Sequence, residues 1–135
     1  MSNAPQMIRS FYAHLDANGG DFSALSQHID PALRFHVPGA FEPLGLAGFR
    51  AFVDEFYAAF PDLRHDVSFQ LSEGNRVATR VTVSGTHRGQ YMGQPATHKR
   101  VAFTAHSICA FEDGKLTDYW LEGDLLGLQR QLMAA

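Results

Sequence analysis

The segment HKRVAFTAHSICAFEDGKLTDYWLE, residues 98–122, decides the fold. Apolar and polar residues alternate in it with a period of two, which is the pattern of strands with one buried face. In its middle, Glu112-Asp113-Gly114 predicts a tight hairpin turn, because the glycine can supply a positive φ. We therefore predict two antiparallel strands, one from about His98 to Phe111 and one from Leu116 to Glu122.

Two more strands are expected upstream of this hairpin. After residue 63 the sequence changes to a period of two, and Glu73-Gly74-Asn75 marks a turn into a strand from Arg76 to about Arg88. The apolar positions of the earlier strand are Val67, Phe69 and Leu71. The glycine-rich stretch Gly89–Thr97 joins this pair to the hairpin, so the second half of the chain predicts an antiparallel meander.

The first half of the chain predicts helices. Residues 5–17 carry apolar side chains at helical spacing and are followed by Asn18-Gly19-Gly20, a helix stop. Asp21 is expected to cap a second, short helix that ends at Asp30-Pro31. A short strand from Leu33 to Val37 should follow.

A loop and a third helix complete this half. Pro38–Gly48 is rich in glycine and proline and predicts a loop that could form a rim or lid. The aromatic stripe after it predicts a core helix that stops at Pro61-Asp62. Its members are Phe49, Phe52, Val53, Phe56 and Phe60. With a short closing helix over Leu125–Leu132, the chain predicts an α+β domain with helices packed on one face of a curved sheet.

The composition limits the class of protein. The chain has 135 residues, 45% of them hydrophobic, and a net charge of −3, so we expect one domain over 1–135 that needs no metal or disulfide. Nucleic-acid and membrane partners are not expected, because no long basic or apolar run exists. The lone Cys109 fits a soluble, cytoplasmic protein. Residues 1–4 are set aside as disordered or tag-derived.

The strand register can be predicted from the turns. If Arg88 faces His98 and Phe111 faces Lys115, one face of the sheet carries two rows of residues. These rows are Thr79, Ser107 and Tyr119, followed by Val81, Ala105 and Leu121. We expect this face to form a core or a small pocket. The opposite face carries Arg80, His106 and Trp120 in one row, and we expect a second subunit to cover it.

Several motifs together resemble one known family. They are Phe11-Tyr12, Phe35-His36-Val37-Pro38, residues 60–64, 85–89 and 93–97, Asp113-Gly114-Lys115-Leu116, and the run from Tyr119 to Leu132. In order and spacing they resemble the SnoaL-like polyketide cyclases of the nuclear transport factor 2-like superfamily. The resemblance implies three N-terminal helices on a strongly bent, mostly antiparallel sheet, which together enclose a conical pocket. It also implies a homodimer through the convex face and no metal or other cofactor.

The resemblance implies a chemistry whose usual residues are missing here. In the best-known cyclases a carboxylate on the last strand removes a carbon-bound proton, the chain closes by an aldol step, and a histidine on the preceding strand assists. Those two positions fall on Leu121 and Ser107. Two functions therefore stay open: a cofactor-free cyclase or isomerase of a small hydrophobic carbonyl compound, and a non-catalytic dimeric binding protein.

Replacement bases and donors can be named from the sequence. His36 carries an imidazole, the side chain best suited to base catalysis, and Asp124 lies just beyond the last strand, so each is a candidate base. His36 has a purely structural role as its alternative, and Asp124 has a helix N-cap. Tyr12 and Tyr119 are candidate donors to a substrate oxygen. The other pocket candidates are Ser107, Thr79 and Leu121, while His14, His28, His65 and His98 are expected at the surface.

Overall fold

The structure, a computed structural model, describes residues 3–134. Its elements in chain order are α1 (Ala4–Ala17), the 3₁₀ helix η1 (Ser23–His28), β1 (Ile29–His36), α2 (Leu46–Ala59), β2 (Arg64–Glu73), β3 (Arg76–Thr86), β4 (Arg100–Glu112), β5 (Lys115–Gly123) and α3 (Leu125–Met133). Residues 1 and 2, part of the segment set aside above, lie outside the described residues. Ala4 does not fit that expectation, since it is buried at the start of α1.

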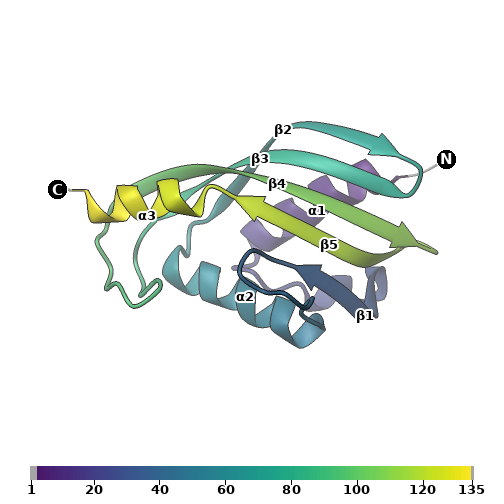
Figure 1. The fold of residues 1–135 in the computed structure, drawn as a ribbon, viewed down its shortest axis with the longest axis horizontal. Coiled ribbons are helices and arrows are strands. Elements are labelled where there is room, and N and C mark those ends of the chain that lie inside the picture. The colour runs from purple at the N-terminus through teal and green to yellow at the C-terminus, as the bar shows by residue number, and fades with distance from the viewer. Residues whose placement is uncertain (1–2, 135) are drawn as a thin grey trace.

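The sheet contains strands in the order β1-β5-β4-β3-β2. Its neighbours pair antiparallel except β1 and β5, which are parallel, so the expected α+β fold with a mostly antiparallel sheet is confirmed. Figure 1 shows α1 behind the sheet and α2 below it. The sheet twists but does not curl strongly, so the strong bend that we expected is wrong. Among the described residues, no helix is long and apolar enough to cross a membrane.

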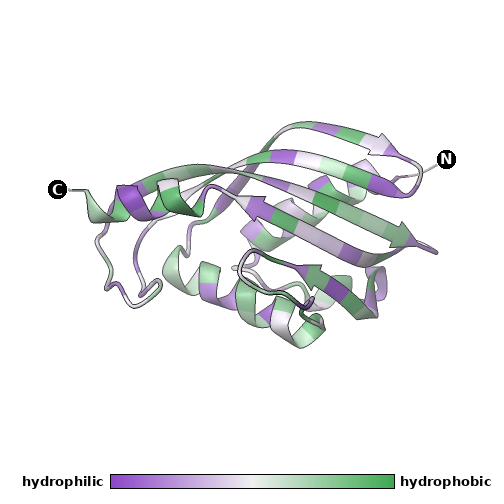
Figure 2. Ribbon diagram, viewed as in Figure 1, coloured by the Kyte–Doolittle hydropathy of each residue, from purple (hydrophilic) through white to green (hydrophobic). Residues whose placement is uncertain are grey.

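The core lies between the helices and one face of the sheet, which we call the inner face. Hydropathy alternates along β3 and β4 (Figure 2), as the period-two pattern predicts. The inner residues of β3, among them Val77, Thr79 and Val81, are buried. The largest fully buried side chains include Phe22, Phe35 and Phe60. Burying these aromatic side chains supplies much of the free energy of folding.

The predicted helices and loop hold with local corrections. The segment after Asp21 is a 3₁₀ helix, and the Asp21 carboxylate accepts from the Ser23 backbone N–H at 2.9 Å rather than capping an α-helix. Asp30-Pro31 was expected to end this helix, but Ile29 already begins β1, so the pair lies inside a strand. The rim loop is shorter than predicted, since α2 begins at Leu46.

The register between β4 and β5 differs from the prediction by two residues. Thr79 faces Ser107 as expected, but Ser107 faces Leu121 and not Tyr119. The hairpin loop contains only Asp113 and Gly114, both with positive φ (52° and 76°), which defines a two-residue type I′ turn. A bulge between the Ala110 and Phe111 pairs adds the rest of the shift. Because a shift of two keeps every side chain on its face, the predicted faces survive.

A second bulge changes the face of part of β2. The register shifts between Val67 and Phe69, and Phe69 then pairs with Arg80. Phe69 and Leu71 are 53% and 67% exposed, whereas Val67 packs on the core. The single alternating face predicted for β2 is therefore wrong beyond Val67.

Candidate functional site

An apolar cavity of about 80 Å³ lies between the helices and the inner face of the sheet. Aromatic and aliphatic side chains of α1, α2, β3, β4 and β5 form its walls, and Val37 and Pro38 of the rim loop contribute to it. Its polar lining residues are Tyr12, Tyr57, His65 and Tyr119. Such a site favours a small hydrophobic ligand held by few polar contacts.

Tyr12 and Tyr119 meet at this cavity. The Tyr12 hydroxyl donates to Ser107 Oγ at 2.9 Å and lies 2.6 Å from the Tyr119 hydroxyl. Either of the two phenol hydroxyls can donate to the other. Burial raises the pKa of both phenols, so both stay protonated near neutral pH. A ligand oxygen that displaces Tyr12 from Tyr119 can accept a hydrogen bond from a phenol.

Of the other predicted contact residues, only one lines the cavity. Leu121 lines the cavity, whereas Ser107 and Thr79 are buried behind its walls and are not lining residues. Thr79 Oγ1 accepts a hydrogen bond from Gln70 Nε2 at 3.2 Å. Ser107 and Thr79 therefore support the wall and do not face the cavity.

His36 faces away from this cavity. Its ring stacks on Trp120 at a centroid distance of 4.7 Å, and its Nε2 lies 3.1 Å from Asp118. Side chains alternate along β1, so the buried Phe35 takes the inner face and His36 takes the outer one. The candidate base His36 is therefore not a lining residue of this cavity, and its contacts fit the structural alternative.

Asp124 caps a helix and is not among the cavity's lining residues. It is the N-cap of α3, and its Oδ1 accepts from the Gly127 backbone N–H at 2.8 Å. Its neighbours Gly123 and Leu125 line the cavity, but the carboxylate itself is exposed. The structure thus places Asp124 in the structural role and not at the cavity.

A group that the sequence analysis missed lies at the cavity instead. His65 Nδ1 lies 2.8 Å from Asp16 Oδ1, and the Asp16 carboxylate also accepts from the His65 backbone N–H and the Tyr57 hydroxyl, both at 2.7 Å. Burial opposes ionisation of Asp16, but the hydrogen bonds and charge of His65 outweigh it, so the pKa of Asp16 is lowered. His65 lies two residues before Val67, and that spacing was a signal for an inward position.

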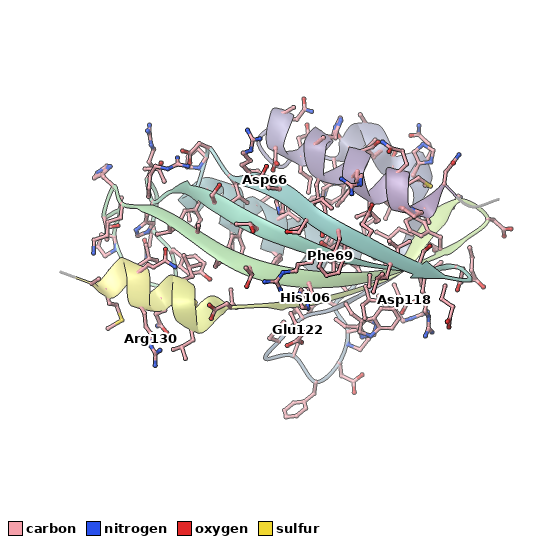
Figure 3. All side chains as sticks on the ribbon, turned by 90° about the horizontal axis from the view of Figure 1, so that it is seen from above. Asp66, Phe69, His106, Asp118, Glu122 and Arg130 are labelled. Atoms are coloured by element: carbon pink, nitrogen blue, oxygen red, sulfur yellow. The ribbon has the colours of Figure 1, made fainter. Side chains whose placement is uncertain are left out.

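The outer face of the sheet carries a different arrangement. Arg80 donates to His106 Nε2 at 2.6 Å, and the next residue in that row is Glu122, not Trp120. Trp120 instead lies under Arg76, whose guanidinium carbon is 5.5 Å from the ring centroid. The predicted row of Arg80, His106 and Trp120 is therefore wrong in its last member. Figure 3 shows His106 and Glu122 on the side of the sheet away from α1.

The outer face also carries an ion pair in which only the carboxylate is buried. Asp118, nearly enclosed, accepts from the guanidinium of Arg34 and lies beside His36. Burial opposes ionisation of Asp118, but these hydrogen bonds outweigh it and lower its pKa. Within residues 3–134, no group of His, Cys, Asp and Glu side chains is placed to hold a metal ion.

Comparison with known proteins places this fold and cavity in one family. Residues 6–132 match the model of the SnoaL-like polyketide cyclases. The chain belongs to the SnoaL-like polyketide cyclase family. It is 30% identical over 107 residues to aklanonic acid methyl ester cyclase DnrD of Streptomyces peucetius, a match that covers 78% of this chain and 72% of DnrD.

Solved structures show the same fold. TsrD of Streptomyces laurentii is 31% identical, with a TM-score of 0.83 over 100% of this chain and 99% of TsrD. IdmH of Streptomyces antibioticus is 26% identical, with a TM-score of 0.85 over 98% of this chain and 100% of IdmH. Both matches span nearly the whole chain, so the similarity is not restricted to one motif.

Proposed function

We propose that the protein binds a small hydrophobic carbonyl compound in the apolar cavity and closes a ring in it by a cofactor-free intramolecular aldol reaction. The observation that carries this proposal is the pair of buried phenols, Tyr12 and Tyr119, at the wall of a cavity that is lined mainly by apolar side chains. The name of DnrD, an ester cyclase, agrees with ring closure. An isomerisation begins with the same proton abstraction.

The proposed reaction uses the phenols as electrophiles. A base removes a proton from the carbon next to a carbonyl group, and the electron pair moves onto the carbonyl oxygen. A phenol hydroxyl stabilises that enolate oxygen by a hydrogen bond. The enolate carbon then attacks a second carbonyl group of the same molecule, and the new alkoxide takes up a proton. The family's usual strand carboxylate cannot serve, because Leu121 occupies its position.

Filling the cavity should abolish ligand binding. We expect cyclohexanone and acetophenone to raise the melting temperature of the parent protein and to appear as 1:1 complexes in native mass spectrometry. Ala105→Leu, in the cavity wall, should lose both effects. Ala102→Leu is the matched control, because Ala102 is exposed on the other face of the same strand. Equal binding by both variants would contradict the proposed site.

A bound ketone that is never converted supports the alternative function. Turnover is tested by incubating the parent protein with a flexible aromatic diketone. Proton NMR detects the cyclic β-hydroxyketone, which is an isomer of the diketone, and mass spectrometry detects its dehydrated form. Ring formation faster than in buffer supports the cyclase. Tight binding without turnover of any diketone favours the non-catalytic binding protein.

We further propose that a second copy of the chain covers the outer face. Phe69, Leu71 and Ile108 are large, apolar and exposed there, and Trp120 lies in the same row as Ile108. The adjoining row carries Arg80 and Glu122, opposite charges that a twofold axis can pair between copies. Exposed apolar groups of this kind are typical of protein interfaces.

If the outer face forms the dimer interface, one charged substitution in it should separate the two subunits. In sedimentation velocity at micromolar concentration, the parent protein should sediment as a dimer and Ile108→Asp as a folded monomer. Leu126→Asp, at an exposed apolar position on α3, should stay dimeric. A monomeric parent protein would contradict this interface.

A further inference from the structure

We propose that His65 is the general base at this cavity and that Asp16 and Tyr57 are its positioning residues. This inference deepens the proposed function and rests on it, because it names the group that removes the carbon-bound proton. It adds a base on β2, an element that the family's usual carboxylate and histidine do not use.

Hydrogen bonding determines which nitrogen of His65 is free. The ionised Asp16 carboxylate can only accept hydrogen bonds, so His65 Nδ1, at 2.8 Å, must carry a proton. In the neutral ring the lone pair is then on Nε2. Among the described residues, no hydrogen bond is made to Nε2. The neutral imidazole therefore presents a basic nitrogen that is not already occupied.

The position of the ring is restrained from several sides. It stacks on the Tyr12 ring at a centroid distance of 4.5 Å and an interplanar angle of 13°. The His65 backbone N–H donates to Asp16 Oδ2, and Tyr57 donates to Asp16 Oδ1. The carboxylate thus links α1, α2 and β2 at one point. A base held by its neighbours loses little freedom when a ligand binds.

No other described lining residue can take this role at neutral pH. The remaining polar lining residues are phenols, and burial keeps Tyr12 and Tyr119 protonated. His87 is 0% exposed, its Nδ1 accepts from the Thr97 backbone N–H, and it does not line the cavity. Imidazole is the side chain whose titration range suits base catalysis near pH 7.

The step balances within the site. His65 Nε2 takes the proton from the carbon next to the carbonyl group and becomes an imidazolium. The electron pair of the broken C–H bond becomes the enolate, whose oxygen the Tyr12 and Tyr119 pair can bind. Asp16 stabilises the imidazolium, which returns its proton to the product alkoxide. No oxidant, reductant or other co-reactant is needed.

A small carbon acid tests the base without the natural substrate. Nitroethane exchanges its α-protons for deuterium in D2O by general-base catalysis, which proton NMR follows. We expect His65→Asn to lower the protein-catalysed exchange about 100-fold. The asparagine amide can still donate to Asp16, so this variant removes the basic nitrogen and leaves the link between α1 and β2. Circular dichroism and the melting temperature show that it is folded.

His36→Asn is the matched control. His36 also lies beside an aspartate, Asp118, but on the other face of the sheet, so its loss should leave exchange unchanged. If the folded His65→Asn variant exchanges nitroethane at the rate of the parent protein, the proposal is overturned. If His36→Asn loses exchange and His65→Asn keeps it, the general base is His36 on the outer face.

The tautomer of His65 separates positioning from a merely structural role. The Asp16 carboxylate requires the proton on Nδ1. In Asp16→Asn the amide can donate to Nδ1 and select the wrong tautomer, so the exchange rate should fall. Nitrogen-15 NMR of the imidazole should show the proton on Nδ1 in the parent protein and on Nε2 in the variant. An unchanged tautomer with an unchanged rate would overturn the role of Asp16.

The two proposals fail in different ways. If His65-dependent exchange of nitroethane is found but no diketone is converted, the base stands and the cyclase function fails. If a diketone is converted equally by the parent protein and by His65→Asn, the cyclase stands and His65 is not its base.

Discussion

Phe35→Ala should lower the free energy of unfolding by about 4 kcal/mol, measured by urea denaturation at neutral pH. Phe35 is 0% exposed on β1, and its ring makes edge-on contacts with Phe49, Phe52 and Tyr119 at centroid distances of 4.9, 5.1 and 5.5 Å. The substitution removes the buried ring and leaves a void that these three rings cannot fill without leaving their rotamers.

The control uses the same substitution at the surface. Phe41, in the rim loop, is fully exposed, so Phe41→Ala should change the free energy of unfolding by less than about 0.5 kcal/mol. A loss below about 1 kcal/mol for Phe35→Ala would contradict the packing of β1 against α2 and β5. Phe35 also lines the cavity, so the variant should admit larger ketones than the parent protein.

Asp16→Ala should lower the free energy of unfolding by about 3 kcal/mol. The Asp16 carboxylate accepts from the Tyr57 hydroxyl and from two groups of His65, and the alanine leaves these donors without their acceptor. The control Asp66→Ala, whose partner Arg64 is exposed on the same strand, should cost less than about 1 kcal/mol.

The same carboxylate predicts how stability depends on pH. The pKa of Asp16 is lowered in the folded protein, so its contribution is complete above the unfolded value of about 3.9 and is lost as pH falls through the folded value. The Asp62 and Asp118 carboxyls have lowered pKa values as well. Urea titrations should therefore show stability falling below about pH 4, and less steeply in Asp16→Ala. Equal slopes would contradict the Asp16 network.

Local sequence patterns predicted most of the fold, because strands and turns are formed by preferences of neighbouring residues. The period-two runs placed β3, β4 and β5, and the Asp113-Gly114 pair located the hairpin, since a type I′ turn needs positive φ at both residues. The predicted register was wrong by two residues, because the turn contains two residues rather than three and because a bulge in β5 leaves no signature in hydropathy. The bulge in β2 likewise moved Phe69 to the outer face against its pattern.

The candidate site could be predicted only in part. Tyr12, Tyr119 and Leu121 were placed at the cavity because each lies on a face that periodicity determines. His36 was chosen for its imidazole and its neighbours in sequence, but its face follows from the buried Phe35 beside it. The sequence analysis predicts His65 at the surface, although His65 lies two positions before the core residue Val67, on the same face of the strand.

The sequence by itself determined the fold class, the order of the elements, the two faces of β3, β4 and β5, and the family to which the chain belongs. These follow from backbone preferences and from apolar periodicity, which act over a few residues. Only the tertiary structure decided the partners: Asp16 meets His65 across 49 positions and Tyr12 meets Tyr119 across 107. Such contacts depend on how α1 crosses the sheet and on the bulges that set the register, and periodicity within a segment carries no information about either.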